Sequence, residues 1–289
     1  MLLTDEKIKF LATKANDIRQ SVVEMLTLAR SGHTAGPLGM ADIFALLYFH
    51  ILNQDPKNPG WDERDRLILS NGHICPVLYA TMAHAGYFPL KDLKTLRLYG
   101  SRLQGHPQRE LLPGIETSSG PLGSGLSQAV GMCLADRLDK GTSSSRYFYC
   151  LMSDGEMDCG ATWEAAMLAG KEGFHNLIGI IDRNNIQIDG FTEDVMPLEP
   201  LADKWRAFGW HVIEADGHSF EEMDEAIGQA KAVFSKPTLI IAHTIPGKGV
   251  HAFERKYEWH GKPPSKEEGA KALKELKELR TLGGRISHD

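Results

Sequence analysis

The sequence predicts an α/β fold in which a mainly parallel central sheet is covered by helices on both faces. In the second half of the chain, short apolar runs alternate with segments of helical length, which indicates repeated β-α-β units. Strands in such units are buried on both faces and are therefore apolar along most of their length. The chain has 289 residues, 42% of them hydrophobic, which is enough to form a substantial core without disulfides or structural metals.

The chain is expected to begin with a long amphipathic helix, because apolar residues recur at alternating spacings of three and four over residues 8–29. Thr4 is a suitable N-cap, and Gly32 is expected to end the helix. Residues 40–52 are apolar on nearly all sides and predict a buried helix. A surface loop with two prolines and several charges is expected over residues 53–66.

The predicted strands and the later helices follow in alternation. The strands are expected at residues 66–70, 147–153, 177–182, 211–216 and 238–243. The helices are expected at residues 126–138, 162–171, 201–208 and 220–234, with a charged surface helix at 265–280. No linker composition interrupts the chain, so residues 1–289 are interpreted as one domain.

Composition and charge disfavour several classes of protein. The net charge of −6 argues against a protein that coats nucleic acid, because phosphate binding depends on clustered positive charge. The four cysteines form no CxxC pair and do not indicate a disulfide framework. The N-terminus lacks a signal-peptide pattern, and the longest apolar stretch, 41–52, is too short to span a bilayer. We therefore expect a cytoplasmic protein that binds neither nucleic acid nor membrane.

Polar residues, most of them beside a glycine, follow four of the predicted strands. The segments are Asn71-Gly72-His73, Asp154-Gly155-Glu156, Arg183-Asn184-Asn185-Ile186 and Pro246-Gly247-Lys248-Gly249. In open parallel sheets, ligands bind beyond the carboxyl ends of the strands. The convergence of these segments at one edge of the sheet predicts a ligand site there.

Asp154 and Asn184 predict a cation site. A carboxylate and an amide oxygen are hard ligands that suit Mg²⁺ or Ca²⁺, and Mg²⁺ often bridges to phosphate oxygens. Gly155 allows the backbone to approach such a ligand closely. The alternative interpretation is that Asp154 only caps the helix that follows it.

A glycine-rich segment, residues 120–125, precedes the predicted helix 126–138. Free N–H groups and the helix dipole make such a turn a site for anions. The segment is not a Walker motif, since no Lys-Ser or Lys-Thr follows it. A tight turn before a core helix, without a ligand, is the alternative.

Several of the twelve histidines stand next to a glycine, among them His33, His73, His106 and His260. Clustered imidazoles suit proton exchange with hydroxyls and carbonyls near neutral pH. A structural hydrogen-bonding role is the alternative for each histidine taken alone. No HExxH motif or paired spacing indicates zinc.

In order along the chain, these motifs resemble the signatures of transketolases. The matching segments are Ser31-Gly32-His33, 37–42, 65–73, Gly105-His106-Pro107, Gly120-Pro121-Leu122-Gly123 and Trp259-His260-Gly261. The segment Ser153-Asp154-Gly155-Glu156, with Asn184 thirty residues after Asp154, resembles the thiamine diphosphate motif of that superfamily. The segment from Asn184 to Gly190 fits the continuation of that motif.

The resemblance implies a role for each matching residue. The metal, Mg²⁺ or Ca²⁺, would be held by Asp154, Asn184 and the backbone carbonyl of Ile186. The cofactor, thiamine diphosphate, would be bound by His73, Gly120, Pro121, Leu122, Asp154, Gly155, Asn184, Lys248 and His260. The catalytic residues that face the substrate and the reactive thiazolium would be His33, His106 and His260.

The sequence departs from the family pattern at several positions. Ser153 stands where glycine is usual, and Thr34-Ala35 replaces a common Pro-Gly. Cys159, which follows Asp158, stands where the family usually has a glutamate of a carboxylate network that links paired active sites. Transketolases also continue into pyrimidine-binding and C-terminal domains, for which this sequence has no counterpart. The resemblance therefore implies the diphosphate-binding subunit of a split enzyme, with a partner chain in an α2β2 assembly.

The implied function is transfer of a two-carbon ketol unit from a ketose phosphate to an aldose phosphate, with activity only in the presence of the partner. Two alternatives stay open: another thiamine diphosphate enzyme, such as a deoxyxylulose-phosphate synthase-like protein, or a non-catalytic binding or regulatory subunit of the same fold. A generic nucleotide-binding domain is disfavoured, because GxGxxG does not follow the first strand. The motifs leave open the sugar-phosphate preference, the choice between Mg²⁺ and Ca²⁺, and the consequence of Cys159.

Overall fold

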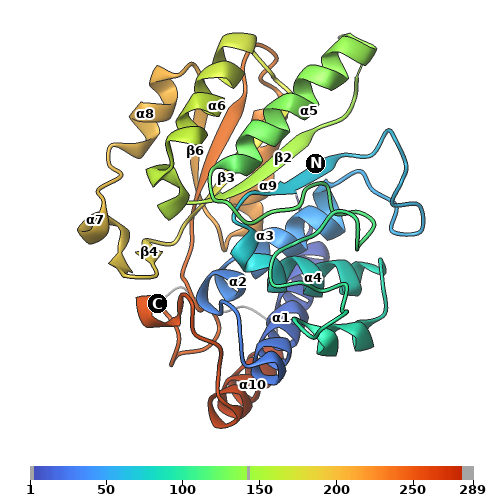
Figure 1. Cartoon of the computed structure of the whole chain (residues 1–289), viewed down its shortest axis with the longest axis vertical. Helices are drawn as coiled ribbons and strands as arrows, with labels where there is room; N and C mark the ends of the chain where they lie inside the picture. Colours follow the sequence, from blue (N-terminus) through green and yellow to red (C-terminus); the bar gives the residue numbers. More distant parts are fainter. Residues whose placement is uncertain (1–2, 142–143, 282–289) are drawn as a thin grey trace.

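The central sheet has five parallel strands in the described part of the computed structural model, which comprises residues 3–141 and 144–281. In spatial order the strands are β1 (Arg66–Leu69), β2 (Phe148–Ser153), β3 (Leu177–Arg183), β7 (Thr238–His243) and β6 (His211–Asp216). Because each neighbouring pair is parallel, the carboxyl ends of all five strands lie at one edge (Figure 1). The predicted α/β fold is confirmed.

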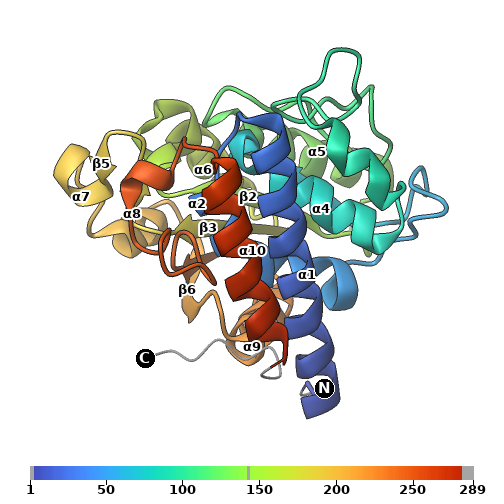
Figure 2. The same cartoon turned by 90° about the horizontal axis from the view of Figure 1, so that it is seen from below.

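Helices cover both faces of this sheet. On one face lie α1 (Asp5–Ala29), α3 (Ala41–Leu46), α4 (Cys75–Ala85) and α9 (Phe220–Lys231). On the other face lie α5 (Ser124–Lys140), α6 (Gly160–Glu172) and α8 (Leu201–Ala207). In Figure 1, α5 and α6 cross in front of the strands, and Figure 2 shows α10 (Lys266–Thr281) alongside α1.

The remaining elements are short. They are α2 (Ala35–Gly39), α7 (Thr192–Val195), the antiparallel strands β4 (Ile186–Gln187) and β5 (Gly190–Phe191), and the 3₁₀ segments Gly72–Ile74, Leu90–Thr95, Gly155–Asp158 and Tyr257–Trp259. Most of them lie in loops that begin at the carboxyl edge of the sheet, where the candidate site is located.

Successive side chains of the strands enter two separate apolar cores. In β2, Tyr149 and Leu151 pack on the side of α1 and α9, whereas Cys150 and Met152 pack on the side of α5 and α6. All four side chains are fully buried. The period of two along a strand that is covered on both faces explains why the sequence is continuously apolar here.

Helix α1 begins as predicted and ends earlier than predicted. The Thr4 hydroxyl accepts a hydrogen bond from the backbone N–H of Lys7, which confirms the N-cap. The helix ends at Arg30, which has a φ of 52° and donates its backbone N–H to Leu26, so the predicted stop at Gly32 is wrong by two residues. A non-glycine residue in the left-handed region closes the last turn here.

The helix predicted over residues 40–52 is present, but it changes pitch part of the way along. Met40, with a ψ near 0°, separates α2 from α3. After α3 the chain widens into a π-helix at Leu47–Ile51, which the backbone bond from Leu52 to the carbonyl of Leu47 closes. An apolar run without periodicity carries no information about such changes of helical pitch.

The predicted strands and the other predicted helices are present, with ends that differ by at most a few residues. The sequence analysis did not predict α2, α4, α7 or the β4–β5 hairpin. Helix α4 is buried along nearly its whole length and so lacks an amphipathic pattern, and the hairpin strands have two residues each.

None of the described helices combines the length and apolar character needed to cross a membrane. The interpretation of residues 1–289 as one domain stays a prediction.

Candidate functional site

The loops at the carboxyl edge of the sheet bring the predicted site segments together. Strands β1, β2, β3 and β7 are consecutive neighbours, so the segments that follow them start side by side. In the β2–β3 pairing, Ser153 lies opposite Asp182, which places Asp154 next to the start of the Asn184 loop. The predicted convergence of these four strand ends is confirmed.

Asp154 is fully buried, and its two carboxylate oxygens have different surroundings. Oδ1 accepts the backbone N–H of Gly155 at 2.7 Å. Oδ2 accepts the backbone N–H of Asn185 at 2.7 Å, together with donors from Arg183 and Thr192 at 3.2 and 3.3 Å. Burial raises the pKa of Asp154 to about 6, against the opposing effect of the backbone donor Asn185 and of Arg183. Asp154 also caps the 3₁₀ segment Gly155–Asp158, so the capping interpretation holds as well.

Asn184 is oriented by Asp182. The Asn184 amide nitrogen donates to Asp182 Oδ2 at 2.8 Å, and its Oδ1 accepts the backbone N–H of Ile186 at 3.0 Å. Asp182 also accepts a short hydrogen bond from the Thr244 hydroxyl. Burial and the nearby charge of Asp154 raise the pKa of Asp182 to about 7. The side chain of Asn184 is therefore held, through Asp182, by the ends of β3 and β7.

Arg183 is a buried cation that the sequence analysis did not single out. Its guanidinium contacts Asp154 Oδ2 at 3.2 Å, Glu193 at 2.6 Å and Glu199 at 3.0 Å. The contacts link the Asp154 turn to the segment that follows β5. An arginine on a strand end carries no sequence signal for these partners, because Glu193 lies in the four-residue helix α7 and Glu199 lies in the loop after it.

The glycine-rich segment is fixed over the Asp154 turn by Glu156. The fully buried Glu156 carboxylate accepts the backbone N–H of Gly123 at 2.6 Å and of Ser153 at 3.2 Å, and a short bond from the Ser70 hydroxyl. Gly123 has a φ of 84° and precedes α5. One carboxylate therefore joins the ends of β1 and β2 to the cofactor-lining segment predicted at Gly120–Gly123.

Glycine contacts place the remaining loops around this turn. A Cβ at Gly72 would lie 3.3 Å from the backbone nitrogen of Gly120, so the His73 turn packs on the glycine-rich segment. A Cβ at Gly261 would lie 3.5 Å from Ile188 and 4.0 Å from His33. Since Ile188 belongs to the hairpin that follows Asn184, the histidine loops adjoin the predicted cation site.

Three of the four histidines that the sequence analysis named beside glycines are in mutual contact. The ring centroids of His33 and His73 are 4.9 Å apart, those of His73 and His260 are 5.2 Å apart, and those of His33 and His260 are 5.4 Å apart. His106 lies near them and contributes to their electrostatics, although no ring contact with it is recorded among the described residues. The loops thus gather imidazoles from four distant parts of the sequence.

The surroundings keep these imidazoles neutral. Burial, with smaller contributions from His260, Arg97 and His106, lowers the pKa of His33 to about 4. Burial, followed by His33, His260 and His106, lowers the pKa of His73. Burial lowers the pKa of His260, and burial together with Arg97 lowers that of His106. A neutral imidazole has one N–H donor and one acceptor, as proton exchange with hydroxyls requires.

Two further polar side chains are buried without a partner among the described residues. Lys248, on the loop after β7, is 3% exposed, and no ion pair or hydrogen bond of its ammonium group is recorded in that part of the chain. Asn71, before Gly72, is fully buried with neither amide atom hydrogen-bonded. Buried polar groups normally have partners, so both indicate room for a polar ligand. The sequence analysis assigned no role to Asn71, although this residue lies in the segment Asn71-Gly72-His73 that follows the first predicted strand.

Other predicted positions are less enclosed. Pro121 and Leu122 are exposed, and the Ile186 side chain is buried. In the described residues, no three side chains of His, Cys, Asp or Glu are arranged to hold a metal ion. The predicted metal-ligand set has only one carboxylate, so a cation there would also need oxygen atoms from a bound small molecule. The individual roles of Asp154, Asn184 and Ile186 stay predictions.

Cys159 borders the glycine-rich segment. A Cβ at Gly123 would lie 2.8 Å from the Cβ of Cys159. Burial, with Glu156 and Asp158, raises the pKa of the Cys159 thiol, so it is uncharged at neutral pH. Asp158 accepts a hydrogen bond from Gln187 at 3.1 Å. Cys159 therefore does not supply the negative charge that a glutamate would bring to this position.

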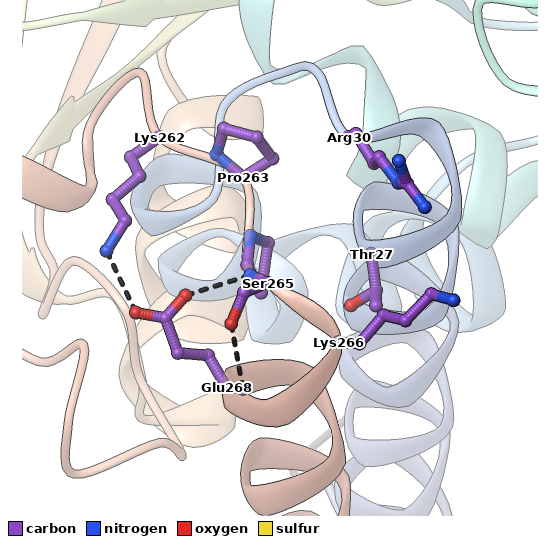
Figure 3. Close-up of a pocket in the computed structure, with 8 residues that line it drawn as sticks. Thr27, Arg30, Lys262, Pro263, Ser265, Lys266 and Glu268 are labelled. Atoms are coloured by element: carbon purple, nitrogen blue, oxygen red, sulfur yellow. Dashed lines mark hydrogen bonds and ion pairs between the residues drawn. The ribbon is translucent and has the colours of Figure 1, made fainter.

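A pocket lies outside this site, between the end of α1 and the start of α10 (Figure 3). It measures about 390 Å³ and is lined by Arg30, Lys262 and Lys266 among others. Its charges are partly compensated, because Lys262 pairs with Glu268 at 2.9 Å. Ser265 and Glu268 cap the first turn of α10 reciprocally. None of the predicted site residues lines this cavity.

A family model described as "Transketolase, thiamine diphosphate binding domain" matches residues 11–279. The chain is 44% identical over 263 residues to the 6-deoxy-6-sulfo-D-fructose transketolase subunit SqwG of Clostridium sp. (strain MSTE9), covering 91% of this chain and 94% of the relative. It is 39% identical over 272 residues to one subunit of the apulose-4-phosphate transketolase of Phocaeicola vulgatus, covering 94% and 95% respectively.

Solved structures give the same likeness. The transketolase from Leishmania mexicana superposes with a TM-score of 0.88 at 35% identity, over 92% of this chain and 41% of that one. The transketolase from Campylobacter jejuni superposes with a TM-score of 0.87 at 37% identity, over 96% and 43%. The chain thus spans about two-fifths of the length of these solved proteins.

Proposed function

Because the chain belongs to the transketolase family through its thiamine diphosphate-binding domain, we propose that it is the cofactor-binding subunit of a two-chain transketolase. The reaction is transfer of a two-carbon ketol unit from a ketose phosphate to an aldose phosphate. The observation that carries this proposal is the contact between His33, His73 and His260 beside the Asp154 turn. Neutral imidazoles next to an anion and cation site suit sugar chemistry at a bound diphosphate.

The residues at the sheet edge fit a diphosphate and a divalent cation. Asp154 Oδ1 and Asn184 Oδ1 each accept one recorded hydrogen bond and retain acceptor capacity for a cation. The buried ammonium group of Lys248, which has no direct ion pair among the described residues, suits the diphosphate, and so does the free amide of Asn71. We assign the cation to Asp154, Asn184 and the Ile186 carbonyl, and choose Mg²⁺ for the first test.

When bound, thiamine diphosphate supplies the carbanion that cleaves and re-forms the carbon–carbon bond. We assign His33, His106 and His260 to the sugar hydroxyls and to the oxygen that gains or loses a proton when the bond breaks. Each imidazole is neutral near pH 7, so it accepts a hydroxyl proton at one ring nitrogen and donates from the other. His73 is assigned to the cofactor side of the cluster.

The two-chain arrangement is supported by the names of relatives. The sulfofructose and apulose phosphate enzymes are named as transketolase subunits, and this chain covers nearly their whole length. We propose a partner chain that supplies the pyrimidine-binding half of the site in an α2β2 assembly. Both names denote sugars with an anionic end, one a sulfonate and one a phosphate, so the substrate class proposed here is an anionic ketose. The predicted cytoplasmic location stays a prediction.

The test is a ketol-transfer assay on this chain, on its C-terminal partner chain and on the mixture of the two, with thiamine diphosphate and Mg²⁺. Donor arms contain a ketose phosphate and a ketose sulfonate. We expect turnover only in the mixture, and a loss of at least about 100-fold in His33→Asn. His251→Asn is the control, since His251 is exposed on a turn and, among the described residues, its ring contacts none of the clustered imidazoles.

Two results would contradict the proposal. Condensation of pyruvate with an aldose phosphate, without ketol transfer, would favour the deoxyxylulose-phosphate synthase-like alternative. Cofactor binding in the assembled complex, without turnover of either donor, would favour the non-catalytic subunit.

A further inference from the structure

Arg97 lies between two of the histidine-bearing loops. It follows the 3₁₀ segment Leu90–Thr95 and has a φ of 60°, in the left-handed region that non-glycine residues rarely adopt. Its backbone N–H donates to the carbonyl of Leu103 at 2.8 Å, which closes a loop over the intervening residues. This hydrogen bond therefore holds the backbone conformation of Arg97, a residue that is remote in sequence from His33.

The guanidinium of Arg97 reaches both loops at once. Nη1 donates to the hydroxyl of Ser31 at 2.9 Å, and Nη2 donates to the backbone carbonyl of Gly105 at 3.2 Å. Ser31 precedes His33 by two residues, and Gly105 directly precedes His106. The planar guanidinium thus fixes the separation of two loops that the sequence places about seventy residues apart.

Both glycines that precede these histidines lie against the guanidinium, and Gly105 makes room for it. A Cβ at Gly105 would lie 3.0 Å from Arg97 Cζ and 3.2 Å from its Nε. A Cβ at Gly32, where φ is 124°, would lie 3.7 Å from Arg97 Nε and 2.6 Å from a methyl of Leu26. The close approach of Arg97 therefore explains the glycine at position 105, whereas Gly32 is required by its positive φ and by Leu26.

The His106 loop is held from a second direction by α4. The Cys75 thiol donates to the carbonyl of Gly105 at 3.2 Å, and the Tyr79 hydroxyl donates to that of Gln104 at 3.0 Å. Helix α4 starts directly after the His73 turn. The loops of His33, His73 and His106 are thus one hydrogen-bonded unit in which Arg97 provides the link to His33.

Among the described residues, Arg97 donates a hydrogen bond to Ser31 and none to the His33 ring, so its effect on that imidazole is electrostatic. Arg97 Nε and His33 Nδ1 are both buried, and neither has a hydrogen-bond partner among the described residues. The titratable groups recorded around Arg97 are His33, His106, Cys75 and Tyr79, and within the described chain no carboxylate pairs with it. Its charge is therefore uncompensated beside the two imidazoles.

We propose that Arg97 is a positioning residue of the active site, which holds the His33 and His106 loops at a fixed separation and places a positive charge beside both imidazoles. The inference rests on the proposed function, because it is that function which gives the two histidines a common task. A cation next to an imidazole disfavours its protonated form, so loss of Arg97 raises the pKa of both histidines.

The test is an NMR titration of histidine ring signals in the purified chain, combined with amide hydrogen exchange of residues 31–33 and 104–106. The variants are Arg97→Gln and Arg97→Lys. Arg102→Gln is the matched control, since Arg102 lies five residues away and forms an exposed ion pair with Asp92. No cofactor, substrate or partner is added, so the result is independent of the ketol-transfer assay.

In Arg97→Gln we expect the measured pKa of His33 and His106 to rise by at least about 0.5, as for a cation a few ångströms away in a largely aqueous dielectric. In Arg97→Lys, which keeps the charge and loses the two-armed hydrogen bonding, we expect little change in either pKa and about tenfold faster exchange in both loops. The control should show neither effect.

The proposal is overturned if both pKa values in Arg97→Gln match the wild type, or if Arg102→Gln changes them equally. If Arg97→Gln fails to fold, Arg97→Lys decides the test. Amide exchange in both loops at the wild-type rate in that variant would overturn the proposal.

Discussion

Asp154 uses its two carboxylate oxygens for different purposes. Oδ2 accepts three hydrogen bonds, from Arg183, Asn185 and Thr192, and so is saturated. Oδ1 accepts only the backbone N–H of Gly155 among the described residues. The orientation of the carboxylate is thereby fixed, with one oxygen still able to bind a cation. At the scale of the residue, the capping role and the ligand role of Asp154 are compatible.

His33 makes stability depend on pH with a definite sign. Its pKa is about 4 in the folded chain, because burial and nearby groups disfavour the imidazolium, against about 6.5 in an unfolded chain. Between these values the unfolded state binds a proton that the folded state does not. The free energy of unfolding therefore falls as pH is lowered from 6.5 towards 4.

We predict that His33→Asn reduces the slope of the free energy of unfolding against pH between pH 6.5 and 4. The reduction should correspond to about one fewer proton taken up on unfolding. The measurement is urea unfolding of wild type and variant at a series of pH values. Between pH 7.5 and 8.5 the two slopes should coincide, since His33 is neutral in both states there. Parallel curves across the acidic range would contradict the assignment of His33 as a buried neutral group.

At the scale of the element, a buried polar network ties the N-terminal helices to the loop that contains Lys248. Both terminal nitrogens of the Arg19 guanidinium, in α1, donate hydrogen bonds to the carboxylate of Asp42, in α3. The distances are 3.0 Å from Nη1 to Oδ1 and 2.5 Å from Nη2 to Oδ2. Ile245 donates its backbone N–H to His218 Nε2, so the proton is on Nδ1, which donates to Asp42 at 2.7 Å. Burial alone raises the pKa of Asp42, but Arg19 and His218 hold it below its usual range.

We predict that Asp42→Asn lowers the free energy of unfolding by about 3–5 kcal/mol, because it leaves the Arg19 guanidinium buried without its counter-charge. Equilibrium unfolding in urea measures this. The matched control is Asp203→Asn, which removes an exposed pair with Arg206 at 2.8 Å and should change stability by no more than about 0.5 kcal/mol. Equal effects of the two substitutions would show that the network contributes no more than a surface ion pair.

The elements also show what the sequence could predict. The strands were predictable, because burial on both faces makes them continuously apolar, and the convergence of Asp154, Asn184 and Lys248 followed from parallel topology. The break between α2 and α3 was not, since an apolar run has no periodicity to mark it. The roles of Arg97 and Glu156 were also not predictable from the sequence. Their hydrogen-bond partners lie 33 to 86 residues away or in separate loops.

At the scale of the molecule, the site is assembled from loops that leave a single edge of the sheet. The family match spans residues 11–279, and the likeness to solved transketolases covers more than nine-tenths of this chain but about two-fifths of theirs. The diphosphate and cation residues proposed here all belong to this chain. Binding of the cofactor diphosphate should therefore depend on Asp154, whatever the partner contributes to the rest of the pocket.

The most direct test is calorimetric titration of the chain with thiamine diphosphate and Mg²⁺, alone and with its C-terminal partner chain, for wild type and Asp154→Ala. The account predicts Mg²⁺-dependent binding by the wild-type complex and at least about tenfold weaker binding by the variant, because a carboxylate ligand is lost. Binding of equal strength in both complexes, or no binding by the wild-type complex, would contradict the proposed site.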